Sequence, residues 1–134
     1  MSIRNYLILG SAFLSLSLSF VSDSNAAPQP KKNTSPIKNQ RGGNNAQVAK
    51  FKTYNEGVDL MMASAHARAQ VKFEAVLKMD PNFAEAHNNL AYVLRKQGED
   101  KYKEALKHYN KAITLKPQMA QAYMYRGVLF VQMN

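Results

Sequence analysis

The feature that most constrains the fold of this chain is a sequence pattern that recurs every 34 to 36 residues. One series places a bulky apolar residue three positions after a small one, at Gly57 and Leu60, Ala91 and Leu94, and Gly127 and Phe130. A second series, spaced by 36 residues, comprises Ala69 and Ala105, Phe73 and Tyr109, and Pro81 and Pro117. The spacing lengthens after Leu94, so we place a two-residue insertion in the turn at Glu99 and Asp100, just after Gly98. Repeats that accept an insertion without losing their packing faces are typical of a solenoid built from helix pairs.

Apolar residues from residue 50 onward recur at the three- and four-residue spacing of amphipathic helices. This pattern predicts five helices, at about 50–63, 66–79, 84–97, 101–115 and 120–133. Pro81 and Pro117 each follow the end of a predicted helix by two residues, where a proline cannot continue the helix. No alternation typical of β-strands occurs after residue 50, so the predicted fold is all-α.

The period and its small residues resemble the tetratricopeptide repeat (TPR), most clearly over residues 84–119. The matching positions are Leu90 and Ala91 in the first helix and Tyr102, Ala105, Tyr109, Ala112 and Pro117 in the second. A weaker copy covers 50–83, and a partial copy covers 120–134. The resemblance implies a short α-solenoid of antiparallel helix pairs, with about two and a half repeats. It also implies a protein–protein interaction adaptor that binds a peptide or protein partner in its concave groove.

Residues 1–26 have the order of a secretory signal peptide: a basic start with Arg4, an apolar run over 6–21 and a polar end with small residues. The run is shorter than the ~20 apolar residues that span a bilayer, and we expect cleavage after Ala26. The alternative is an uncleaved anchoring helix, in which case this segment would contact a membrane. We therefore expect an exported protein, either periplasmic or secreted.

Residues 27–49 are predicted to form a disordered basic linker, because apolar residues are scarce there and Pro, Gly, Asn and Lys are abundant. Counted to residue 50, this stretch carries five bases and no acid, whereas 51–134 carries 12 bases and 8 acids. We interpret the linker as a solvated spacer. The alternative is an arm that attaches the protein to an anionic polymer or membrane. Nucleic acid is not an expected partner, because the arm has no aromatic residue to stack on bases.

The sequence offers little chemistry for catalysis, and we predict that the protein is not an enzyme. It contains no cysteine, which excludes thiol catalysis and cysteine-based metal sites. His66, His87 and His108 are evenly spaced, but no carboxylate joins two of them at ligand spacing on one helix. We expect His87 to pack at the opening aromatic position of its repeat, His66 to lie at a turn and His108 to face outward. No metal or other cofactor is therefore predicted.

In proteins of this family the first helix of each pair lines the concave groove, so the resemblance assigns the candidate partner-binding residues. They are Tyr54, Val58, Asn88, Asn89, Tyr92, Arg95, Lys96, Met124, Tyr125 and Val128, with Gln121 and either Met61 or Met62 beside them. Tyrosine and arginine are frequent binding hot spots, and methionine surfaces adapt to different partners. We expect Asn88 and Asn89 to bind the backbone of an extended peptide, and Arg95 or Lys96 to pair with an acidic side chain. The alternative for each residue is a solvated position or support for the neighbouring repeat.

The predicted helix 120–133 is the first member of a pair whose second member does not follow in this sequence. Its Tyr123, Gly127 and Phe130 would form an apolar face with nothing over it, whereas terminal repeats usually have polar outer faces. We expect the chain either to self-associate through this helix or to be a shortened form of a longer array. A third alternative is a truncated remnant without an independent function.

Overall fold

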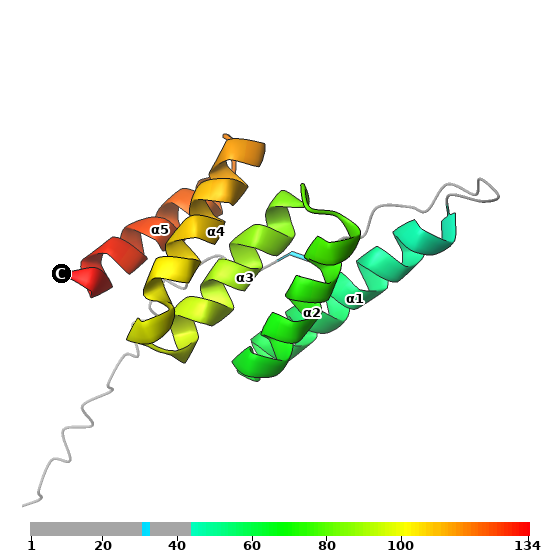
Figure 1. Ribbon diagram of the computed structural model, residues 1–134, viewed down its shortest axis with the longest axis horizontal. Helices are drawn as coiled ribbons and strands as arrows, with labels where there is room; N and C mark the ends of the chain where they lie inside the picture. The colour runs from blue at the N-terminus through cyan, green and yellow to red at the C-terminus, as the bar shows by residue number, and fades with distance from the viewer. Residues whose placement is uncertain (1–30, 33–43) are drawn as a thin grey trace, which may run out of the picture.

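The computed structural model describes residues 31–32 and 44–134, and this part of the chain contains five α-helices and one short 3-10 helix (Figure 1). These are α1 (Asn44–Met62), α2 (His66–Met79), α3 (Ala84–Gln97), η1 (Glu99–Lys101), α4 (Tyr102–Leu115) and α5 (Ala120–Met133). The described residues contain no strand, which confirms the all-α prediction. The predicted signal peptide, residues 1–26, lies outside them. Among the described helices, none has the length and apolar character needed to cross a membrane.

Four of the five helices have nearly the predicted bounds. α2, α3 and α5 begin and end as predicted, and α4 begins at Tyr102 because η1 occupies the preceding three residues. The first helix differs, since it begins at Asn44, six residues before the predicted start. Residues 44–49 are therefore helical and do not belong to a disordered linker. Residues 45–49 are exposed, and a helical extension that buries no apolar face leaves no periodic signal in the sequence.

Each helix packs against the next one along the chain, and α3 also contacts α1 and α5. The helices therefore form two layers, α1, α3 and α5 in one and α2 and α4 in the other, as in a solenoid of antiparallel helix pairs (Figure 1). The small residues of the repeat lie where helices cross: Ala69, Ala91 and Ala105 have no exposed surface. At Gly57 a Cβ atom would lie only 2.8 Å from Cε1 of Phe73, so the glycine allows α1 and α2 to approach closely.

The core contains the bulky residues that recur in the repeat. Phe73 of α2 and Tyr109 of α4 occupy equivalent positions and are both fully buried. Leu94 and Leu129 are likewise fully buried, in α3 and α5. Burying one such side chain stabilises a fold by roughly 1.5–3 kcal/mol, so these residues fix the helix pairs against one another.

In each complete repeat, the residue directly after the second helix precedes a proline and pairs with the first helix of the same repeat. Asp80, after α2, accepts a hydrogen bond from Lys50 of α1 at 2.8 Å. Lys116 occupies the equivalent position after α4 and contacts Glu85 of α3 at 2.7 Å. The two ion pairs therefore have opposite polarity at equivalent places in the fold.

Lys50, which was counted with the five bases of the linker stretch, is a packed residue of α1. Its side chain is only 11% exposed, and its ammonium lies 4.9 Å from the ring centre of Phe51 and 5.1 Å from that of Phe83. Cations over aromatic faces are attracted by the ring quadrupole. The ion pair with Asp80 and these two rings make Lys50 part of the packing between α1 and the turn that follows α2.

The two-residue insertion coincides with η1. Gly98 ends α3 with a φ of 148°, a conformation that residues with a side chain rarely adopt. The chain then makes one 3-10 turn before α4 begins. The extra residues thus stay between the helices, and the packing faces of α3 and α4 keep their phase.

Candidate functional site

A cavity of about 400 Å³ lies on the layer formed by α1, α3 and α5. It is bounded by α1, by the first turns of α3 and by the start of α5. We call the surface around it the groove; its lining residues are Lys31, Tyr54, Glu85, Asn88, Asn89, Lys116, Gln118, Met119, Ala120 and Gln121. Tyr54, Asn88 and Asn89 belong to the predicted partner-binding set, so the structure brings these three together at one place.

Hydrogen bonds between side chains cross the groove from α1 to α5. Asn89 Nδ2 donates to the hydroxyl of Tyr54 at 2.9 Å. Asn88 Nδ2 donates to Asn89 Oδ1 at 3.2 Å and to Gln121 Oε1 at 3.4 Å. Gln121 Nε2 in turn donates to the hydroxyl of Tyr125 at 3.4 Å. We call this set the amide ladder. Because Asn88 and Asn89 are 1% and 2% exposed, their polar groups are held at fixed positions rather than solvated.

The amide ladder leaves one buried acceptor unsatisfied. Asn88 Oδ1 has no hydrogen-bond partner among the described residues, although the side chain lines the cavity. A buried carbonyl without a partner costs ~1–3 kcal/mol, which an N–H donor from a ligand would recover if the Asn88 side chain turned this oxygen toward the cavity. The hydroxyl of Tyr54 is protonated at neutral pH and can donate, and burial raises its pKa further above the usual value. The groove can therefore both accept from and donate to a peptide backbone.

Besides Lys31, the charged lining of the groove comes from Glu85 of α3 and Lys116 beyond α4. They pair at 2.7 Å, and both side chains are more than a third exposed. Exposed ion pairs of this kind contribute only about 0.2–1 kcal/mol, so a ligand can exchange partners with either group. Glu85 is the equivalent, 36 residues earlier, of Gln121. Sequence reasoning named Gln121 and missed Glu85, although the repeat spacing relates the two positions.

A second group of predicted residues meets between α3 and α5. The rings of Tyr92 and Tyr125 have their centres 5.1 Å apart, and the guanidinium of Arg95 lies 5.3 Å and 5.9 Å from those two ring centres. Arg95 Nη1 also donates to Gln132 Oε1 at 3.0 Å. Tyr92 and Arg95 are half-buried. We call these three residues the Arg95 cluster; it presents a cation on an aromatic base, which suits an acidic or aromatic ligand group.

The other predicted residues differ in their exposure. Val58 has no exposed surface and Tyr125 is 4% exposed, because both side chains belong to the hydrophobic core between the helices. Val58 therefore supports the groove from within the core. Lys96 is exposed, and Met124 and Val128 of α5 are 37% and 41% exposed, so these three are accessible to a partner.

The histidines also correct one expectation. His108 does not face outward: its Nδ1 lies 2.9 Å from Nδ1 of His87, and the two rings stack. Nε2 of His87 lies 2.9 Å from the carbonyl oxygen of Pro81, so Nε2 donates and Nδ1 must accept the proton of His108. Burial lowers the pKa of both histidines, that of His108 to about 4. Periodicity could not reveal this pair, because it depends on two side chains from adjacent helices.

The described residues provide no cluster of three or more His, Cys, Asp or Glu side chains that could hold a metal ion. His66 lies apart from the other two histidines and contacts the ring of Tyr92. The chemistry of the groove is therefore that of hydrogen bonding and ion pairing.

Comparison with known families agrees with the helical repeat. A model described as TPR repeat matches residues 99–134, and a model described as tetratricopeptide repeat matches residues 72–107. The two matches overlap and together run from α2 to the end of α5. Both matches are to repeats of the tetratricopeptide type, which typically occur in non-catalytic scaffolds for protein interactions. Among curated proteins, no match to this chain was found.

Proposed function

We propose that this protein is an exported adaptor that binds an extended segment of a protein partner in its groove. Tetratricopeptide-type repeats act in general as protein-interaction scaffolds. The groove provides a surface for such an interaction, because its cavity has both apolar and polar lining residues and is large enough for a few residues of a peptide. An extended segment is favoured because its free backbone N–H and C=O groups can meet the amide ladder.

The observation that carries this proposal is the unpaired Oδ1 of Asn88. This atom is buried, the Asn88 side chain belongs to a ladder whose other members are hydrogen-bonded, and that side chain is part of the cavity lining. A backbone N–H from a peptide would satisfy it. The Arg95 cluster lies further along the same helix layer, so a peptide that crosses α3 could place an acidic side chain against Arg95 or the exposed Lys96.

Selection from a displayed peptide library with the full chain tests this function. Selected peptides should bind at least tenfold more weakly to the Tyr92→Ala and Arg95→Ala variants, since hot-spot residues typically contribute 2 kcal/mol or more, or about thirtyfold. Lys107→Ala changes an exposed lysine of α4, outside the groove, and serves as the matched control. Circular dichroism verifies that each variant is folded. Equal loss in all three variants, or in none, would contradict a peptide that runs from the groove across α3 to the Arg95 cluster.

Export is supported by the signal-peptide pattern of residues 1–26. We expect the mature protein to begin at Ala27 and to be found in the periplasm or the culture medium. Intact-mass measurement of the protein recovered from these fractions tests this. Recovery of the chain with residues 1–26 still attached would instead favour an anchoring helix.

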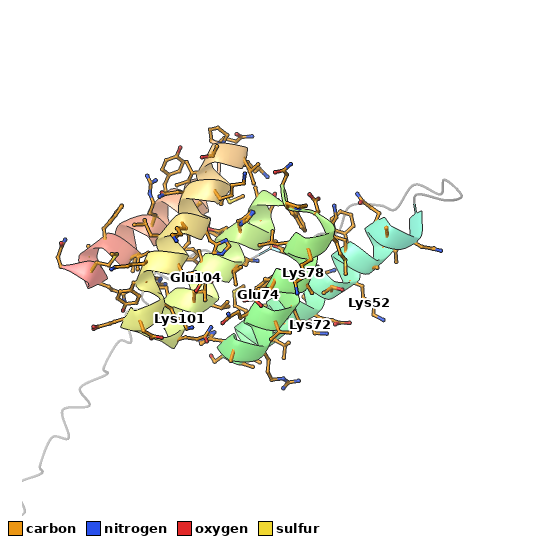
Figure 2. The ribbon with its side chains drawn as sticks, viewed as in Figure 1. Lys52, Lys72, Glu74, Lys78, Lys101 and Glu104 are labelled. Carbon is orange, nitrogen blue, oxygen red and sulfur yellow. The ribbon has the colours of Figure 1, made fainter. Side chains whose placement is uncertain are left out.

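A second candidate function, attachment to an anionic polymer or membrane, is favoured by lysines on the layer of α2 and α4. Lys103, Lys107 and Lys111 recur every four residues on α4, are exposed, and make no ion pair within the part of the chain that the structure describes. Figure 2 shows further charged side chains over α1, α2, η1 and α4: Lys52, Lys72, Lys78 and Lys101, together with Glu74 and Glu104.

Salt separates the two functions. Attachment to an anionic surface should weaken strongly when the salt concentration rises from low to moderate values, because exposed charges are screened. It should also weaken in a variant with Lys103, Lys107 and Lys111 changed to Gln. Binding of a peptide that runs from the groove to the Arg95 cluster should weaken in Tyr92→Ala and remain largely unchanged in the lysine variant.

We also propose that a second copy of the chain covers the outer face of α5. On this helix Tyr123, Phe130 and Val131 are 44%, 46% and 77% exposed. Gly127 is equivalent to Gly57, against which Phe73 packs, yet a Cβ at Gly127 would meet nothing within 4 Å. The face thus has the small residue of a helix crossing but no helix across it among the described residues.

A further inference from the structure

Two residues of the predicted linker lie against the groove. The backbone carbonyl of Lys31 accepts a hydrogen bond from the hydroxyl of Tyr54 at 3.4 Å, and Lys31 is one of the residues that line the cavity. The ammonium of Lys32 forms an ion pair with the carboxylate of Asp59 on α1. Residues 31 and 32 are the short cyan segment in Figure 1.

These are the two kinds of contact by which a protein recognises an extended peptide. The first contact is a hydrogen bond to the main chain from the hydroxyl of Tyr54, which Asn89 holds in place. The second contact is an ion pair between a lysine side chain and the carboxylate of Asp59. Extended ligands typically gain affinity from the first kind and specificity from the second.

The charges around Asp59 favour a cation at this position. Glu56, one helical turn before Asp59, is already paired with Lys72 of α2 at 2.6 Å. Glu85, the acid that lines the groove, is paired with Lys116. Asp59 pairs with no other lysine or arginine of the described residues, and its side chain is 59% exposed. It is therefore the carboxylate that can receive a lysine from an incoming segment.

We propose that Tyr54 and Asp59 form a subsite for a lysine of an extended peptide, and that Lys31 and Lys32 of the same chain occupy this subsite in the free protein. The proposal rests on the proposed groove function and specifies its ligand: a segment with a lysine at the α1 end. A partner must then displace the chain's own segment before it can bind there.

The competition is moderate in strength. An exposed ion pair is weak, but a tethered ligand has an effective concentration on the order of millimolar. The apparent affinity for a partner falls by the fraction of chains whose subsite is free. We therefore expect the tethered segment to lower the affinity of a competing peptide by about twofold to fivefold, rather than to abolish binding.

Zero-length crosslinking tests the contact itself in the full chain. A carbodiimide joins an amine to a carboxylate only when the two are in contact, so mass spectrometry should find a bond between Lys32 and Asp59 in monomeric chains at low concentration. The bond should be absent from Asp59→Asn, and crosslinks of Asp59 to Lys38, a linker lysine six residues on, should be much rarer. The absence of the bond between Lys32 and Asp59, or its presence only in crosslinked dimers, would contradict occupancy by the same chain.

Peptide binding tests the subsite. The probe is a fluorescently labelled peptide of residues 27–36, APQPKKNTSP, and its control is the same peptide with both lysines replaced by serine. The probe should bind about twofold to fivefold more tightly to the full chain carrying Lys31→Ser and Lys32→Ser than to the unaltered chain. Adding Asp59→Asn to that variant should remove the preference for the lysine peptide over the serine peptide.

The outcomes separate this proposal from the general one. Equal affinity of the probe for both chains, or a lysine preference that survives Asp59→Asn, would overturn the lysine subsite. Library peptides that still depend on Tyr92 and Arg95 would then leave the groove function standing. The reverse outcome is also informative. If library peptides do not depend on Tyr92 and Arg95, but the crosslink and the Asp59-dependent lysine preference are found, the lysine subsite is supported and the proposed peptide binding at the Arg95 cluster is contradicted.

Discussion

At the scale of single residues, two glycines at equivalent positions differ in their surroundings. Gly57 lies against Phe73, which is fully buried and cannot move away, whereas Gly127 faces open space. Alanine favours a helix over glycine by about 1 kcal/mol, but overpacking a core costs about 1–3 kcal/mol. We therefore expect Gly57→Ala to lower the free energy of unfolding and Gly127→Ala to raise it by up to ~1 kcal/mol. Urea unfolding measures both, and a stabilised Gly57→Ala would show that α1 and α2 do not approach as closely as described.

The stacked histidines predict a dependence of stability on pH. Both have a lowered pKa in the folded state, chiefly through burial, and Lys107 and Lys111 disfavour their protonation while Glu74 favours that of His108. The unfolded chain therefore binds more protons between the ordinary histidine pKa of 6.5 and the folded value of about 4 for His108. Stability should be full above pH ~6.5 and should fall as the pH is lowered toward 4.

The test compares unfolding free energies at neutral and mildly acidic pH. His108→Phe should reduce the loss of stability on acidification, because one of the two buried imidazoles no longer titrates. His66 has a lowered pKa as well but is less buried, so His66→Gln should have a smaller effect on the pH dependence. An unchanged pH profile in His108→Phe would show that other groups cause the acid sensitivity.

At the scale of elements, the two pre-proline ion pairs have the same place in their repeats but different burial. Lys50 is 11% exposed and pairs with Asp80, whereas Lys116 and Glu85 are 43% and 38% exposed. We expect Lys50→Ala to lower the free energy of unfolding by about 1.5–3 kcal/mol, since it removes a partly buried hydrogen bond between charged groups. Lys116→Ala should cost about 0.2–1 kcal/mol, and Lys52→Ala, an exposed control on α1, less than about 0.5 kcal/mol. Thermal unfolding ranks the three, and similar costs for Lys50 and Lys116 would contradict the role of burial.

The elements also show what the sequence could and could not predict. Helices α2, α3 and α5 could be delimited because their buried faces have a helical period and prolines follow α2 and α4. The first six residues of α1 could not, since they bury no apolar face. Within the groove, residue spacing indicated Asn88 and Asn89. It could not indicate the burial of Val58, which depends on distances between helices, or the position of Lys31, which belongs to a segment remote in the chain. The repeat alone does not determine those distances.

At the scale of the whole molecule, the net charge of +9 and the apolar face of α5 predict opposite responses to salt. Copies of a strongly basic chain repel one another, so association through Tyr123, Phe130 and Val131 should increase when salt screens that repulsion. Attachment to an anionic surface should instead decrease. Sedimentation of the full chain over a range of salt concentrations measures self-association, and sedimentation together with the anionic surface measures attachment.

Substitution of one apolar residue identifies the face that associates. Phe130→Asp should give a monomer at concentrations where the unaltered chain forms dimers, because a charge would be buried between the two copies. Val71→Asp is the matched control: Val71 is 63% exposed but lies on α2, away from α5, so its substitution should leave the dimer intact. If the unaltered chain stays monomeric in high salt, a second copy does not cover α5. A dimer that persists in Phe130→Asp would lead to the same conclusion. The exposed Tyr123 and Phe130 would then remain available to a different protein, and the open side of Gly127 would mark where its helix can approach.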